Sequence, residues 1–98
     1  WTPLHYAASK GHTAMMRLLI ENDAYIDAES PNGTTPLMMA AYYATPNAVK
    51  LMLEEGADPT LQNKDGQTAL AMAASKDKLL SVKYIRAFIE ALELRESQ

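Results

Sequence analysis

Apolar side chains recur along this chain in short stripes with the spacing of an α-helix, in which neighbours lie three or four positions apart. The first stripe contains Met15, Met16, Leu18 and Leu19, and the second contains Val49, Leu51, Met52 and Leu53. A third, longer stripe contains Val82, Ile85, Ile89 and Leu92, with Tyr84 and Phe88 on a flanking row and several charged residues towards its end. These patterns predict three amphipathic helices, of which the last is the longest and ends in a polar tail.

A shorter helix is predicted before each stripe. The segments Thr2–Ala7, Thr35–Ala40 and Thr68–Ala73 read TPLHYA, TPLMMA and TALAMA. Threonine favours the position before a helix, where its hydroxyl accepts a backbone hydrogen bond, and proline suits the first helical turn. We therefore expect first helices that end near Lys10, Tyr43 and Lys76, and a second helix in the middle of the chain that starts at Thr45-Pro46.

The three hexapeptides lie 33 residues apart, and other positions keep the same offset. The alanine pairs Ala7-Ala8, Ala40-Ala41 and Ala73-Ala74 align, and Asn32-Gly33 aligns with Asp65-Gly66. A 33-residue period with this hexapeptide resembles the ankyrin repeat. The resemblance implies an all-α solenoid of helix-turn-helix units joined by short β-hairpin loops. It also implies one ankyrin-repeat domain over residues 1–98, with units at about Trp1–Gly33, Thr34–Gly66 and Gln67–Gln98.

The two ends of the array are expected to differ. The third unit departs from the repeat after Asp77, and its longer helix should cap the stack, because a terminal unit lacks one neighbour. The chain begins at Trp1 without an initiator methionine, so upstream repeats are expected. Without them, Tyr6, Met15, Met16 and Leu19 should form an uncovered apolar surface. With them, the protein should be a monomer.

Three turn positions carry a side chain where another unit has glycine. Asp23 aligns with Gly56 at the end of the second helix, whereas Ala44 and Asp77 align with Gly11. A side chain in the left-handed conformation is strained, although Asp and Asn tolerate it best. We expect Asp23 to adopt this conformation, and the inter-helix turns to differ in shape between units.

Composition and charge argue against several classes of partner. The formal net charge is −3 and the pI is about 5.2, which disfavours nucleic acid because phosphates attract basic surfaces. The longest apolar run, Leu37–Ala44, is far shorter than the roughly 20 residues of a membrane-spanning helix, so a soluble protein without membrane insertion is expected. The absence of cysteine excludes disulfides and leaves a cytoplasmic or an exported location equally open.

No catalytic pattern is present, and we expect no enzyme activity, no cofactor and no metal site. The resemblance assigns structural hydrogen bonds to both histidines, His5 with the Thr2 hydroxyl and His12 across the turn. The six methionines are expected mainly to fill the core.

A column of charge is expected on the convex side. Arg17, Lys50 and Lys83 share one repeat position, and Glu21 and Glu54 follow one helical turn after the first two. Pairs at this spacing stabilise a helix by about 0.2–0.5 kcal/mol each. The pattern favours a solvated outer face over a phosphate-binding ridge.

Tyr42 and Tyr43 distinguish the middle unit, because the matching pairs are Ser9-Lys10 and Ser75-Lys76. In ankyrin repeats these positions and the hairpin tips line a concave face where partners dock. Tyrosine is a favoured interface anchor, although one ring could instead pack over the next hairpin. The candidate partner-binding residues on this concave face are Trp1, Ser9, Lys10, Pro31, Asn32, Thr34, Tyr42, Tyr43, Lys64, Asp65, Gln67, Ser75 and Lys76.

Two functions therefore remain open. The first is a protein–protein interaction module that binds a partner protein through the concave face, with Trp1 either extending the aromatic patch or packing against an upstream repeat. The second is a structural or capping segment of a longer array whose binding or catalytic part lies upstream.

Overall fold

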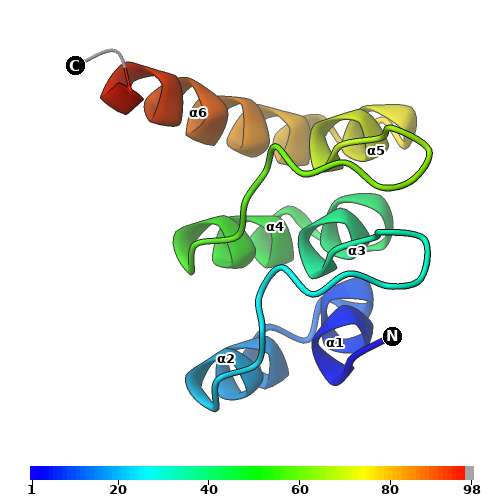
Figure 1. Ribbon diagram of the computed structural model, residues 1–98. Helices are drawn as coiled ribbons and strands as arrows, with labels where there is room; N and C mark the ends of the chain where they lie inside the picture. Colours follow the sequence, from blue (N-terminus) through cyan, green and yellow to red (C-terminus); the bar gives the residue numbers. More distant parts are fainter. Residues whose placement is uncertain (97–98) are drawn as a thin grey trace.

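The computed structural model describes residues 1–96, which form six α-helices in three stacked pairs (Figure 1). The helices are α1 (Pro3–Lys10), α2 (Thr13–Glu21), α3 (Pro36–Tyr43), α4 (Pro46–Glu54), α5 (Ala69–Ser75) and α6 (Leu79–Glu96). One row of the stack consists of α1, α3 and α5, and the other consists of α2, α4 and α6. The described residues contain no strand, so the predicted all-α repeat fold is confirmed. The third expected unit ends with residues 97–98, which lie outside the described residues.

Each first helix begins as predicted, directly after a threonine. The hydroxyl oxygens of Thr2, Thr35 and Thr68 accept hydrogen bonds from the backbone N–H three residues later, at 3.3, 3.3 and 3.1 Å. Pro3 and Pro36 occupy the first position of α1 and α3, where the missing N–H would have had no partner inside the helix. Each first helix therefore starts at the same position of its 33-residue unit.

His5 connects the first unit to the second. Its side chain is completely buried, and its Nδ1 lies 2.8 Å from the Thr2 hydroxyl and accepts from the Thr2 N–H at 3.2 Å. The other ring nitrogen, Nε2, lies 2.7 Å from the Thr34 carbonyl oxygen, which can only accept, so Nε2 carries the proton. The structural role expected for His5 is confirmed.

The hydrophobic core runs through all three units. Its largest fully buried members are Leu4, Met16, Leu37, Met38, Val49, Met52 and Ile85. The alanine pairs of the first two units are buried against neighbouring helices, and their small side chains permit close approach. Five of the six methionines fill this core as predicted, whereas Met15 is 49% exposed.

The turns between helices confirm one expectation and refine another. Asp23 has a φ of 67° and thus adopts the left-handed conformation of its counterpart Gly56. Asp77, with a φ of 55°, also keeps the conformation of Gly11, which has a φ of 69°. Ala44 has an extended backbone instead, because alanine has no polar side chain that eases a positive φ. The inter-helix turn therefore changes shape in the middle unit alone.

The connections between units are tight turns rather than paired strands. Each turn is closed by two backbone bonds. In the first, Ser30 N–H donates to Thr34 O at 2.9 Å and Gly33 N–H donates to Ser30 O at 2.8 Å. In the second, Asn63 N–H donates to Gln67 O and Gly66 N–H donates to Asn63 O, both at 3.0 Å. A further bond, from Lys64 N–H to Asn32 O at 2.9 Å, joins the two turns. We call residues 30–34 and 63–67 the turn tips. These bonds form no strand within the described residues, and the expected β-hairpins are reduced to these turns.

Gly33 makes the contact between the turn tips possible. Its φ is 77°, and a Cβ at this position would lie 3.2 Å from the Asn63 Cα and 3.3 Å from the Lys64 nitrogen. A side chain here would therefore be strained and would push the second tip away. The close approach of the tips holds the loops of neighbouring units in one layer.

The exposed apolar surface at the start of the stack differs in part from the prediction. Tyr6 and Met15 are exposed as expected and Leu19 is half-buried, but Met16 is fully buried. Leu18, which was not expected there, is 53% exposed. The matching residue in α4, Leu51, is buried beside Thr13 and Arg17 of the first unit.

Candidate protein-binding surface

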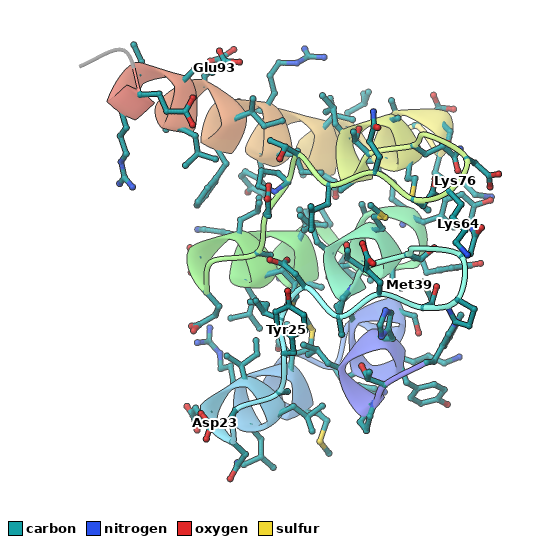
Figure 2. The ribbon with its side chains drawn as sticks, viewed as in Figure 1. Asp23, Tyr25, Met39, Lys64, Lys76 and Glu93 are labelled. Atoms are coloured by element: carbon teal, nitrogen blue, oxygen red, sulfur yellow. The ribbon has the colours of Figure 1, made fainter. Side chains whose placement is uncertain are left out.

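A hollow of about 350 Å³ lies between the turn tips and the ends of α3 and α5. All three units contribute to it, and its lining consists of Trp1, Ser30, Asn32, Thr34, Met39, Tyr42, Tyr43, Asn63, Gln67 and Met72. Six of the thirteen candidate residues are thus brought together. Figure 2 labels Met39 on α3 and shows Lys64 and Lys76 on the side of the stack where the turn tips lie.

Tyr42 and Tyr43 have different environments. The two rings pack edge to face with centroids 4.6 Å apart, and the Lys76 ammonium lies 4.7 Å from the centroid of the Tyr42 ring. Tyr42 is half-buried by these contacts, whereas Tyr43 is 58% exposed. Tyr42 thus packs against Tyr43 and against Lys76 at the end of α5, and Tyr43 presents the more exposed aromatic surface.

Trp1 forms the third aromatic side of the hollow. Its ring stacks on the His5 ring with centroids 6.5 Å apart and an interplanar angle of 23°, and it remains 68% exposed. The hydrogen bonds of His5 to Thr2 and Thr34 fix the imidazole on which the indole rests. Trp1 is thus held at the hollow by one face while the other face stays open.

Several other candidate side chains are occupied by internal contacts. The hydroxyls of Ser9 and Ser75 donate to the carbonyl oxygens of Tyr6 and Met72, each at 2.7 Å. Thr34 is nearly buried, and the Lys10 ammonium lies 5.8 Å from the centroid of the Tyr6 ring, away from the hollow. Pro31 and Asp65 are exposed on the turn tips beside the hollow.

Sequence reasoning missed four lining residues, namely Ser30, Met39, Asn63 and Met72. Met39 and Met72 precede Tyr43 and Lys76 by one helical turn, so the i,i+4 spacing could have indicated them as the floor. Asn63 has a structural role, because its Oδ1 accepts from the N–H groups of Asp65 and Gln67, both at 3.0 Å. The asparagine thereby fixes the second turn tip.

The convex column offers fewer organised contacts. Lys50 and Glu54 form the expected pair, but at 3.9 Å and with both side chains about half exposed, so their attraction is weak. Arg17 and Glu21 form no ion pair in the part of the chain that the structure describes. A shallow hollow of about 300 Å³ lies between α2 and α4, and its lining includes Arg17, Lys50 and Glu54.

The titratable groups of residues 1–96 were also compared with the spacing that a metal site requires. Within residues 1–96, no three His, Cys, Asp or Glu side chains lie close enough to hold a metal ion. His12 is exposed and makes no side-chain cap; its backbone N–H, not its ring, bonds across the turn to Ala7 O. None of the described helices has both the length and the apolar character needed to cross a membrane.

The Asp27 carboxyl lies in the loop that follows α2 and is partly buried. Burial raises the pKa of its carboxyl, and repulsion from the Asp58 carboxylate adds to this effect. A hydrogen bond that its Oδ1 accepts from the Asp58 N–H, at 3.1 Å, opposes the rise. The side chain fastens one inter-unit loop to the next and lies away from the hollow's lining residues.

Comparison with known proteins shows which families and proteins this chain resembles in sequence. The family model described as ankyrin repeats (3 copies) matches residues 1–63 of this chain. A putative ankyrin repeat protein of Rickettsia bellii is 36% identical over 102 residues, which covers 95% of this chain and 42% of that protein.

Two mammalian proteins are similar over a shorter stretch. Mouse ankyrin repeat and SAM domain-containing protein 6 is 44% identical over 69 residues, which covers 69% of this chain and 8% of that protein. Human BCL-6 corepressor-like protein 1 is 37% identical over 75 residues, covering 76% of this chain and 4% of that protein. The chain therefore spans less than half the length of each of these relatives.

Proposed function

Because the chain belongs to the ankyrin repeat family, whose members are generally protein-interaction modules, we propose that it binds a partner protein through its concave face. The observation that supports this proposal is the hollow formed by residues of all three units, with Trp1 and Tyr43 exposed on its sides. Large aromatic side chains around a polar-lined depression are typical of interface anchors.

The proposed mechanism is rigid presentation. The two turn tips are joined by the backbone bond from Lys64 to Asn32. The Asn63 side chain accepts from the Gln67 N–H, and the His5 ring stacks with the Trp1 ring. Because these groups are ordered before a partner arrives, little conformational entropy is lost on binding. A projecting apolar or aromatic side chain of the partner would enter between Trp1 and Tyr43, above Met39.

The test begins with capture of partner proteins and then measures dissociation constants for variants. Replacing Tyr42 with Ser and Tyr43 with Lys introduces the residues used by the flanking units, so the fold should be preserved. The double variant should lose at least about 2 kcal/mol of binding free energy, the usual threshold for an interface hot spot.

The matched control is the double reversal Lys50→Glu and Lys83→Glu on the convex side. It should change affinity much less, because exposed charges mainly tune the association rate. Unchanged binding by the tyrosine variant, or loss of binding on reversal of the lysines, would transfer the site to the convex face.

A structural role as part of a longer array is supported by a different observation. An open groove of about 790 Å³ at the start of the stack is lined by apolar residues that include Tyr6, Met15 and Leu19. A preceding repeat would cover this groove in the way that α3 and α4 are covered by the first unit. The two roles are compatible, because a supporting unit can also carry binding residues.

A further inference from the structure

A second groove, of about 840 Å³, lies beneath the C-terminal half of α6, and it shares no lining residue with the concave hollow. It arises because α6 has 18 residues whereas its neighbour α4 has 9. Figure 1 shows α6 extending past the end of α4. Beyond Glu54 the chain turns through Gly56 and Pro59, so the last turns of α6 face a loop instead of a helix.

The walls of this groove are apolar. On α6, the fully buried Ile85 packs into the core, and Phe88, Ile89 and Leu92 continue its stripe at helical spacing into the groove. These three residues are only partly covered, and Leu92 is 36% exposed. Leu53 and Ala57 form the opposite wall. The amphipathic face of α6 is thus longer than the surface the fold provides to cover it.

The rim of the groove is strongly acidic. Its lining contains four carboxylates, of Glu54, Asp58, Glu93 and Glu96, against the single guanidinium of Arg95. The Asp58 carboxylate already accepts from the Thr60 N–H and hydroxyl, and Glu54 lies 3.9 Å from Lys50. Glu93 and Glu96 are exposed on the helix that projects over the groove.

We propose that this groove binds a short basic amphipathic segment of a partner protein. Its apolar side chains would insert between Leu92 and Leu53, and its lysines or arginines would lie against Glu93 and Glu96. An apolar groove that accepts one face of an amphipathic segment is a recurring mode of peptide recognition.

Charge decides between this occupant and a second copy of the chain. A symmetric dimer through the groove would oppose one acidic rim to another, because the same patch faces itself across a two-fold axis. Such like-charge juxtaposition is unfavourable. A cationic segment removes this repulsion and covers the same apolar area.

The probe for the test is a fluorescein-labelled synthetic peptide with leucines at i and i+4 and lysines at the remaining positions. Fluorescence anisotropy at physiological ionic strength measures its binding to the intact chain. Two control peptides carry glutamate in place of lysine or alanine in place of leucine. Both should bind at least about tenfold more weakly, because each lacks one of the two required interactions.

Variants of the protein locate the binding. Glu93→Lys with Glu96→Lys should weaken peptide binding about tenfold or more, and Leu92→Gln should do the same by removing an apolar contact. Glu21→Lys with Glu29→Lys changes the net charge equally but leaves the groove intact, so it is the matched control. Thermal melts verify that each variant is folded, and the tyrosine double variant of the concave face should bind the peptide normally.

Several outcomes would overturn the proposal. They are absence of binding, equal binding of the glutamate peptide, and an equal loss in the Glu21 and Glu29 control, which would indicate attraction to the whole acidic molecule. Self-association that is abolished by Leu92→Gln in sedimentation would assign the groove to a second copy instead. None of these results bears on the concave face, which is tested by different variants.

Discussion

Ser81 is a polar residue in a position that the repeat otherwise fills with an apolar side chain. Ser81 is fully buried, and its Oγ has no hydrogen-bond partner among the described residues. The matching residue in the middle unit is Ala48, which is equally buried. The hydroxyl therefore carries a desolvation penalty with no compensating bond.

Ser81→Ala should raise the free energy of unfolding by about 1 kcal/mol, because it removes the unpaired hydroxyl and leaves only a small volume change. Urea titration monitored by circular dichroism measures the difference. Ser75→Ala is the control: the Ser75 hydroxyl is bonded to Met72 O at 2.7 Å, so its removal should not stabilise the protein. A lower urea midpoint for Ser81→Ala would show that the hydroxyl is hydrogen-bonded in solution.

Asp27 gives the protein a defined pH dependence. Burial raises the pKa of this carboxyl above its ordinary value of 3.8, so the folded state holds the proton more tightly than the unfolded chain. The resulting stabilisation is complete below pH 3.8 and is lost as the pH rises through the raised pKa. At neutral pH the ionised Asp27 carboxylate therefore lowers the stability of the folded state relative to a neutral side chain.

Asp27→Asn should stabilise the protein near neutral pH, because the amide oxygen still accepts from the Asp58 N–H while the charge is removed. Below pH 3.8, Asp27 is protonated in both the folded and the unfolded protein, so both side chains are neutral. The stability gained from removing the charge should therefore disappear there. Thermal melts near pH 7 and near pH 3 test this. A stability difference that is independent of pH would mean that the carboxylate is not penalised.

At the scale of single elements, the helices were predictable because their signals are local. The Thr-Pro starts, the alanine pairs and the stripe of α6 each depend on residues within a few positions, and the structure contains all of them. The left-handed conformation of Asp23 was also predictable, because alignment with Gly56 carries backbone information. A different turn at Ala44 was also predictable, because alanine replaces the glycine found at Gly11, but its extended shape had no counterpart in another unit.

The candidate site was less predictable than the helices, because burial depends on contacts between units. Thr34 shares a repeat position with Trp1 and Gln67, yet it is nearly buried because its carbonyl lies against the His5 ring. Ser9 and Ser75 look like free polar residues in the sequence, and their hydroxyls are bonded to the helix backbone. Periodicity indicates which positions are equivalent but not which of them remain accessible.

At the scale of the whole molecule, the open groove at the start of the stack leads to a test of the array model. Placing a second copy of residues 34–66 directly before Trp1 keeps the 33-residue register. The added unit should cover Tyr6, Met15 and Leu18, and apolar burial contributes about 25 cal/mol per Å². The extended protein should have a higher melting temperature and less self-association.

Differential scanning calorimetry and sedimentation velocity measure these two properties. The control fusion has three glycines between the added copy and Trp1, which disrupts the register while preserving the added sequence. It should gain less stability than the in-register fusion. If the original chain is already monomeric and is as stable as the in-register fusion, the apolar surface does not require a neighbour.

The contacts of the first helices run from neighbour to neighbour, from α1 to α3 and from α3 to α5, and this pattern predicts the order of amide hydrogen-exchange rates. A terminal unit opens by breaking one interface, whereas the middle unit opens only after an interface on each side has been broken. For the chain as given, we therefore expect the backbone amides of α3 and α4 to exchange most slowly with solvent, which hydrogen-exchange mass spectrometry measures. Tyr42 and Tyr43 belong to this slowest-exchanging unit, so fraying of the ends leaves the aromatic pair in place.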